Sequence, residues 1–207
     1  MDLRRLAHEE RADFAAFLAT LSPEQWETPS LCVGWRVRDV VAHVISYDEL
    51  DARGLARRFA RGWFLPNRVN AVGLTDYRTR TPDELLAVLN AHLEPRGLTA
   101  AFGGMIALVD GLIHHQDIRR PLGLPREIPE ERLLPTLRAA RAAPPIRGFW
   151  RARGVRLVAT DLDWAAGAGP EVQGPAEALL MAMAGRRGIV RELSGPGQLE
   201  LAARIDG

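Results

Sequence analysis

One segment of this chain, residues 110–121, constrains the fold most strongly, because it places polar side chains inside an otherwise apolar run. The segment reads DGLIHHQDIRRP and contains two of the five histidines. A helix through it brings Asp110 and His114 onto one face, one turn apart, with Asp117 one turn further on. A carboxylate and an imidazole at this spacing can bind one divalent metal ion together. We therefore expect other helices to cover this face and to complete the site.

The third ligand is predicted on another helix that carries a lone histidine in an apolar face. His43 meets this description, within the segment DVVAHV of residues 39–44. A site of His43, Asp110 and His114 leaves positions open for water or substrate, which is typical of a catalytic metal. Mixed nitrogen and oxygen ligands favour Zn²⁺ and are compatible with Fe²⁺, Ni²⁺, Co²⁺ or Mn²⁺.

The helical period also decides between the two adjacent histidines. His114 shares its face with both aspartates, whereas the residues at the same offsets from His115 cannot bind a metal. His115 is expected to be a neighbour of the site. Asp39 and Asp117, each one turn from a ligand, could orient the rings of His43 and His114.

Simpler interpretations stay open for the same residues. The histidines could be ordinary polar residues at helix ends or hydrogen-bonded core residues. Asp39 and Asp117 could be solvated helix charges or partners of neighbouring arginines. Tyr47, one turn after His43, is expected to pack rather than to take part in a site.

Helical periodicity dominates the first 143 residues. Helices are predicted at residues 3–21, 35–50, 81–93 and 100–119, with short ones after Ser22 and at 130–142. Thr81-Pro82 gives a helix start, Pro121 a helix stop, and residues 51–80 resist assignment. Four principal helices with inward polar residues indicate a bundle with its site in the core.

The composition changes after Pro144-Pro145. Residues 155–160 alternate and are rich in β-branched side chains, which predicts a strand, and 171–173 and 198–203 are predicted as further strands. Residues 175–184 are predicted as a helix. The tail is therefore expected to be a small α+β unit.

Composition and charge exclude several classes of function. The chain has 207 residues, a net charge of +1 and 27 basic residues, all of them arginine. A charge near zero argues against a nucleic-acid partner. The absence of lysine excludes Schiff-base and P-loop lysine chemistry. The single cysteine, Cys32, excludes an internal disulfide and a multi-cysteine metal site.

The N-terminal segment is charged and amphipathic, unlike a signal peptide. No apolar run approaches the roughly 18 residues that cross a bilayer. We therefore expect a cytoplasmic protein without membrane contact, as a monomer or a homodimer.

Two stretches carry a more specific signal. Residues 31–43 read LCVGWRVRDVVAH, and residues 110–123 read DGLIHHQDIRRPLG. The first resembles the opening motif of the mycothiol-dependent maleylpyruvate isomerase family, within the wider DinB-like superfamily, where Cys-x-Gly-Trp leads into the helix of the first metal histidine. The second resembles the family's Glu-x-x-x-His motif, which carries the other two ligands. Residues 160–164, 174–180 and 185–186 resemble its C-terminal domain.

This resemblance implies an α+β protein with an N-terminal DinB-like four-helix bundle, residues 1–143, and a small C-terminal α+β domain, residues 150–207. It implies His43, Asp110 and His114 as metal ligands. The family has glutamate where this chain has Asp110, whose carboxylate is one methylene shorter. Whether the metal shifts, binds more weakly or is absent stays open.

The resemblance also implies a chemistry based on mycothiol, a low-molecular-weight thiol. The metal would lower the thiol pKa and hold a thiolate that adds to a small electrophilic substrate. Addition, rotation and elimination give cis–trans isomerisation, whereas relatives transfer the thiol. Arg186 is the candidate to hold a substrate carboxylate, with a surface salt bridge as the alternative.

The leading hypothesis is thus a metal- and mycothiol-dependent isomerase or S-transferase. A non-catalytic small-molecule-binding or regulatory protein on the same fold is the alternative that Asp110 favours. A metal-dependent hydrolase would turn over without added thiol. Cys32 is expected to be a packing thiol rather than a nucleophile, and Trp35 and Trp164 are expected to be core residues.

Overall fold

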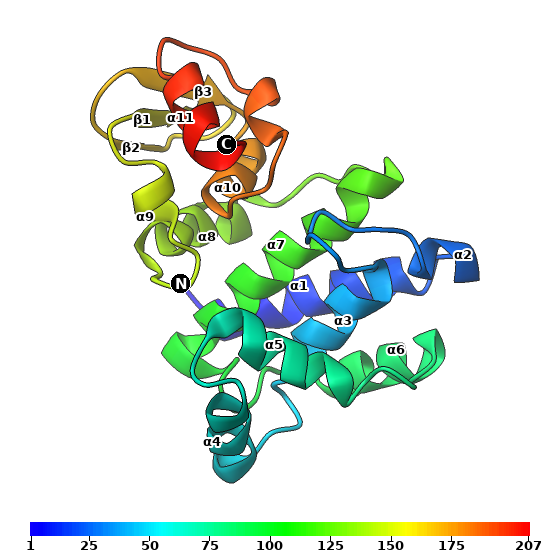
Figure 1. Ribbon diagram of the computed structural model, residues 1–207. Coiled ribbons are helices and arrows are strands. Elements are labelled where there is room, and N and C mark those ends of the chain that lie inside the picture. Colours follow the sequence, from blue (N-terminus) through cyan, green and yellow to red (C-terminus); the bar gives the residue numbers. More distant parts are fainter. The chain divides into compact units, whose positions relative to one another are not determined.

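The computed structural model describes all 207 residues, apart from the side chains at positions 66 and 67. The chain forms two compact units, Met1–Pro125 and Arg126–Gly207 (Figure 1). The first unit is built from helices, and the second combines helices with a small sheet. The expected α+β fold class is therefore confirmed.

The boundary between the units lies earlier than the expected one between residues 143 and 150. The helix α8 (Glu130–Ala142), which was assigned to the bundle, packs against α9 (Gly148–Arg151) and α10 (Ala176–Met183) in the second unit. Periodicity could not reveal this, because an amphipathic helix shows the same apolar stripe whichever unit covers it.

Four helices form the bundle of the first unit, α1 (Leu3–Leu18), α3 (Val37–Ile45), α6 (Pro82–Ala91) and α7 (Met105–Leu122). Both α6 and α7 pack against α1 and α3, so that the four helices surround a common core (Figure 1). Fully buried apolar side chains fill this core; among them are Phe14, Leu18, Val40, Val41, Ile45, Leu85, Leu89 and Ile118.

Capping side chains determine where these helices begin. Asp2 accepts hydrogen bonds from the backbone N–H groups of Arg4 and Arg5 at the start of α1. Thr81 and Glu84 form a reciprocal capping box before α6. Ser22 caps the short helix α2 (Pro23–Trp26) in the same way. These starts follow from the sequence because the cap residues bond to their own neighbours.

Residues 51–80 form two helices, α4 (Ala52–Arg61) and α5 (Pro66–Thr75), which pack against each other, with α5 also against α3. Helix α4 could not be assigned from the sequence because its segment ARGLARRFAR contains only two large apolar residues, Leu55 and Phe59. A 3₁₀ turn, η1 (Ala101–Gly104), precedes α7.

Pro121 does not stop α7, contrary to expectation. The helix continues to Leu122 and is capped by Gly123, which has a left-handed φ of 66°. Proline lacks the N–H that would bond to the carbonyl of residue 117. That carbonyl instead accepts the N–H of Leu31 at 3.0 Å, which ties the loop before α3 to α7.

The second unit contains a three-stranded sheet of β1 (Arg156–Ala159), β2 (Ala165–Gly167) and β3 (Glu171–Gly174). The strand order is β2-β1-β3, with β1 antiparallel to β2 and parallel to β3. The helix α10 packs against β1 and β3. Nothing in the sequence predicts β2, because its residues AAG are poor strand formers. A 3₁₀ turn, η2 (Ile189–Glu192), follows α10.

Residues 198–203, expected as a strand, belong to the helix α11 (Gln198–Ile205). In a strand Leu199 and Leu201 would face the same side, but Leu201 is 1% exposed and Leu199 is 83% exposed. The buried pair is Leu201 and Ile205, four residues apart as in a helix. So short a segment fits both periods.

None of the described helices combines the length and the hydropathy that a membrane span requires.

Candidate metal centre

Three side chains from α3 and α7 gather at one place in the bundle. Asp110 and His114 follow each other by one turn of α7, and His43 comes from α3, which packs against α7. Their ligand atoms all lie within 4.8 Å of one another. Both histidines are buried, whereas the Asp110 side chain is 31% exposed. The structure thus brings together the predicted ligand set, with its carboxylate reaching towards solvent.

The distances within this group suit a single metal ion. Asp110 Oδ1 lies 3.5 Å from His43 Nε2 and 3.4 Å from His114 Nε2. Two ligands of a tetrahedral zinc ion, each at roughly 2.1 Å from the metal, lie about 3.4 Å apart. The carboxylate of Asp110, although shorter than that of a glutamate, therefore reaches both imidazoles.

A fully buried carboxylate orients His114, as the sequence predicted. Asp117 Oδ2 lies 2.8 Å from His114 Nδ1. An Nδ1–H donated to this carboxylate leaves Nε2 unprotonated, which a metal ligand requires. The thiol of Cys32 donates to the same oxygen at 3.1 Å. Cys32 is therefore part of the polar network behind His114.

Cys32, His114 and Asp117 also lie close enough to be considered as metal ligands themselves. The separation of 2.8 Å between His114 Nδ1 and Asp117 Oδ2 is, however, a hydrogen-bond distance, shorter than the about 3.4 Å between tetrahedral ligands. We therefore interpret this group as support for His114 rather than as a second metal site.

The substitution Asp117→Asn is expected to weaken metal binding about 10- to 100-fold while preserving the fold. The amide has the shape of the carboxylate but lacks the charge that raises the basicity of the His114 ring. Competition with a chromophoric zinc chelator measures the change. Asp39→Asn serves as the control, and equal dissociation constants for the two variants would contradict the role of Asp117.

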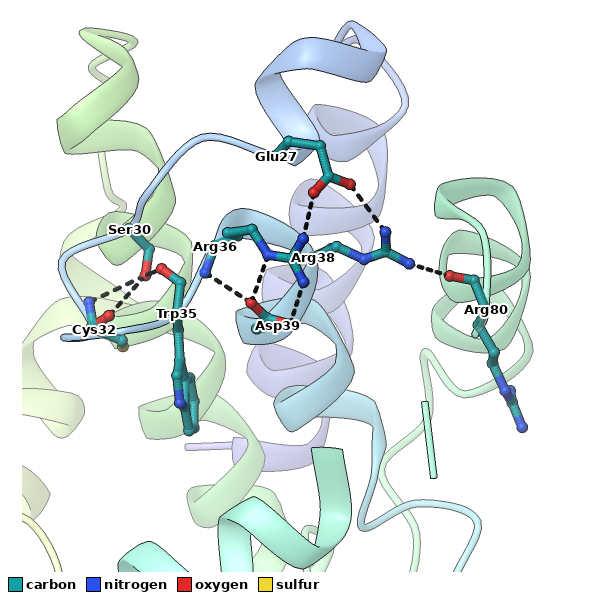
Figure 2. A network of polar contacts seen from close by, with 8 residues as sticks. All are labelled: Glu27, Ser30, Cys32, Trp35, Arg36, Arg38, Asp39 and Arg80. Carbon is teal, nitrogen blue, oxygen red and sulfur yellow. Dashed lines mark hydrogen bonds and ion pairs between the residues drawn. The ribbon is translucent and has the colours of Figure 1, made fainter. Parts of the chain in front are cut away.

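Aromatic neighbours, rather than a carboxylate, hold His43. Its ring centre lies 5.1 Å from that of Trp35 and 5.9 Å from that of Tyr47. Its Nδ1 is buried and has no hydrogen-bond partner among the described residues. Asp39, predicted to orient this ring, instead accepts hydrogen bonds from the backbone and guanidinium of Arg36 (Figure 2). Of the two interpretations left open for Asp39, the structure supports pairing with a neighbouring arginine, because a side chain in the first helical turn folds back towards the cap.

The loop before α3 is fixed by its own hydrogen bonds. The Ser30 hydroxyl accepts from the backbone N–H of Cys32 at 3.1 Å and donates to the carbonyl of Trp35 at 2.9 Å (Figure 2). These bonds set the positions of Cys32 and Trp35. Cys32 donates to Asp117, which in turn contacts the candidate ligand His114, and the ring of Trp35 packs against the candidate ligand His43. Trp35 therefore borders the centre as well as packing against the core.

Opposite charges dominate the electrostatics of the metal-free centre. Burial raises the pKa of Asp110, but the imidazoles of His114 and His43 outweigh burial and hold that pKa below its usual range. Burial lowers the pKa of His114, but Asp110 and Asp117 outweigh it and raise that pKa well above its usual value. Without metal, Asp110 is ionised and His114 is protonated near neutral pH.

Binding of a zinc ion near pH 7 is therefore expected to release about one proton, because His114 must lose its proton to become a ligand. Metal affinity should fall as the pH decreases, since protons then compete for Nε2. Calorimetric titration of the metal-stripped protein with Zn²⁺, in buffers of different ionisation enthalpy, counts the protons. A count near zero would contradict the raised pKa of His114.

The adjacent histidine belongs to a different network. His115 is fully buried, with Nδ1 3.0 Å from Glu10 Oε1, and its Nε2 accepts from Arg119 Nε at 2.8 Å. Its ring packs on Phe14, with 4.8 Å between the ring centres. His115 thus stabilises the core between α1 and α7, and the choice of His114 from the helical period agrees with the geometry.

Other predicted residues lie in the second unit. Trp164 is buried, as expected, and also lines an open cleft with Arg138, Arg141 and Asp163. Arg186 donates to the carbonyl of Ala184 at 3.0 Å, and its role towards a substrate stays a prediction.

Two further polar residues beside the centre could not be identified from the sequence. Arg58 and Asn70 both contact Tyr47 and come from the segment that resisted assignment. Neither residue belongs to a periodic pattern or a motif. They approach Tyr47 only because α4 packs against α5 and α5 packs against α3.

Comparison with known proteins adds an independent line of evidence. A family model described as the mycothiol maleylpyruvate isomerase N-terminal domain matches residues 7–119. A crystal structure of the mycothiol-dependent maleylpyruvate isomerase is similar over 95% of this chain and 92% of that chain, with 18% identity and a TM-score of 0.65. A histidine-to-alanine mutant described under the same name has 17% identity over the same shares, also with a TM-score of 0.65. No curated protein matches.

Proposed function

Since the chain belongs to the mycothiol maleylpyruvate isomerase N-terminal domain family, we propose that it is a metal-dependent enzyme that uses mycothiol to isomerise a small electrophilic substrate or to transfer the thiol to it. The family expected from the two sequence motifs is confirmed by this match. The observation that carries the proposed activity is the convergence of Asp110 Oδ1 on both His Nε2 atoms, at 3.5 and 3.4 Å.

We assign His43, Asp110 and His114 as the ligands of a divalent ion, with zinc favoured by the tetrahedral spacing and nickel, iron, cobalt and manganese as alternatives. Such an ion, when bound, supplies Lewis acidity that favours the ionised form of a thiol.

The remaining residues of the site have supporting roles in this proposal. Asp117 keeps the His114 proton on Nδ1 and so leaves Nε2 free. Trp35 and Tyr47 hold the His43 ring and shield that side from water. The exposed part of Asp110 marks the side open to substrate and thiol. Arg186 belongs to the second unit, and its role in binding a substrate carboxylate stays a prediction from the sequence.

Partners and location follow from the same proposal. The enzyme needs a small electrophile and a reduced thiol, and it needs neither a nucleic acid nor a membrane. Dependence on a reduced thiol, in a chain with a single cysteine, fits a cytoplasmic location. Either a monomer or a homodimer is compatible with a site built from one chain.

The test is turnover of the zinc-loaded protein with and without mycothiol. Maleylpyruvate, which appears in the name of the similar structures, and simpler conjugated electrophiles are the substrates to try. We expect turnover that requires both the thiol and His43, with His43→Ala as the inactive control. Turnover without thiol would instead indicate a metal-dependent hydrolase, and no turnover with any electrophile would indicate a binding protein.

A further inference from the structure

A buried arginine lies beside the candidate metal centre without an acidic partner. Arg58 of α4 is 4% exposed. Its Nη1 donates to the hydroxyl of Ser46 at 2.9 Å, and its guanidinium carbon lies 4.8 Å from the centre of the Tyr47 ring. Among the residues whose side chains are described, no carboxylate pairs with it. By contrast, Arg11, which is also buried, forms an ion pair with Asp48.

An unpaired buried guanidinium is costly. It carries a full charge and five N–H donors, and removing such a charge from water is compensated only by an opposite charge and by hydrogen bonds. A hydroxyl and an aromatic face do not supply a negative charge. The surroundings of Arg58 therefore lack a negative charge, which an anionic ligand would supply.

The local structure keeps a space for this guanidinium. A Cβ atom at Gly73 would lie 2.9 Å from Arg58 Nη1, so a side chain at that position would press on it. The Ser46 hydroxyl that receives Arg58 donates in turn to the carbonyl of His43 at 2.9 Å. Arg58 is thus linked by two hydrogen bonds to the backbone of a candidate metal ligand.

Tyr47 lies between Arg58 and the metal centre. Its ring meets the His43 ring edge-on, and its hydroxyl donates to Asn70 Oδ1 at 2.8 Å. The tyrosine ring therefore contacts both the guanidinium of Arg58 and a candidate metal ligand.

We propose that Arg58, supported by Tyr47 and Asn70, binds a carboxylate of the small molecule that occupies the metal centre, and so determines which electrophiles the protein accepts. The planar guanidinium matches a carboxylate with two parallel N–H bonds. The identity of that molecule as a substrate rests on the proposed function, whereas the anion site itself does not.

The test measures the melting temperature with and without acetate or succinate, at constant ionic strength, for both zinc-loaded and metal-stripped protein. Succinate well above its dissociation constant should raise the melting temperature of the wild type by roughly 2–4 °C or more. Arg58→Gln should abolish this shift in both forms. Arg57→Gln, which removes an exposed arginine of the same helix, should preserve it.

The comparison holds even if the variants differ in stability, because each shift is measured within one variant. Should Arg58→Gln not fold, Arg58→Lys keeps the charge without the fork and should reduce the shift. An equal shift in Arg58→Gln and wild type, no shift in wild type, or a shift lost only in Arg186→Gln would overturn the proposal.

A kinetic arm separates this inference from the proposed function. If the enzyme is active, Arg58→Gln should raise KM for a carboxylate-bearing electrophile about 10- to 100-fold, and should leave KM for its neutral ester unchanged. Equal effects on the acid and the ester would overturn the assignment. If no turnover is found, an Arg58-dependent melting shift still supports the anion site while the proposed function fails.

Discussion

Purified without chelator, the His43→Ala protein is expected to carry almost no transition metal, whereas the wild type carries about one equivalent. The proposed centre has three protein ligands, and the two residues that pack against His43, Trp35 and Tyr47, present aromatic rings that do not replace the imidazole. Four ligands of a structural zinc site share roughly 10–16 kcal/mol, so one ligand corresponds to a loss of affinity on the order of a hundred- to a thousandfold. Elemental analysis of the two proteins side by side measures this, and thiol-dependent turnover should disappear with the metal.

The matched control is His8→Ala. His8 lies on α1, and its Nδ1 pairs with Glu94 at 3.0 Å, outside the candidate centre. This variant should retain the metal. A wild type that remains free of metal after incubation with Zn²⁺ or Ni²⁺ would contradict the centre and favour a binding protein on the same fold.

Helical periodicity was sufficient to propose the three candidate ligands, and the resemblance of residues 31–43 and 110–123 to a known family favoured them over the simpler interpretations. A spacing of four residues fixes which side chains share a face, so Asp110 and His114 could be paired and His115 set aside without knowledge of the fold. The lone histidine in the apolar face of α3 could be added because a buried polar residue needs a partner. These inferences depend on local geometry, which the sequence determines directly.

The residues around the ligands were harder to predict, because their roles depend on position within a helix and on distant contacts. Asp39 and Asp117 both lie one turn from a ligand, yet the first folds back to Arg36 at the start of its helix and the second is buried mid-helix against His114. Pro121 carried a local signal for a helix end. Its actual effect is that the carbonyl of residue 117 has no helical partner and accepts the N–H of Leu31. This contact depends on the tertiary arrangement.

The predictions for short segments and for the boundary between the units failed for a related reason. The residues of α11 fit two periods, and only burial of Leu201 and Ile205 decides for the helix. The apolar stripe of α8 was recognised correctly, but the sequence does not say which unit covers it. Arg58 and Asn70 were missed because nothing in the sequence distinguishes the buried Arg58 from the exposed arginines of the same helix, and Asn70 belongs to no motif.

The substitution Asp48→Ala is expected to destabilise the first unit by about 3–5 kcal/mol, because it leaves a buried charge without its partner. The Arg11 and Asp48 side chains are 1% and 0% exposed and are joined by two hydrogen bonds of 2.8 and 3.2 Å. Thr99 donates to the same carboxylate at 2.6 Å. Without Asp48, the guanidinium of Arg11 retains its hydrogen bond to the carbonyl of His92 but has lost its negatively charged partner. The loss is a large part of the roughly 5–15 kcal/mol that stabilises a typical domain.

Urea denaturation of wild type and variant measures this loss, with Glu9→Ala as the control. Glu9 pairs with Arg5 at the surface, where an ion pair contributes about 0–1 kcal/mol. The result also bears on Arg58, because Asp48→Ala places Arg11 in the condition that Arg58 has in the native chain. If both variants lose little stability, an unpaired buried arginine is tolerated in this bundle, and the argument that Arg58 awaits an anion loses its physical basis. If Asp48→Ala lowers the free energy of unfolding as expected, the unpaired Arg58 of the native chain carries a comparable penalty. A carboxylate bound beside the metal centre would relieve that penalty.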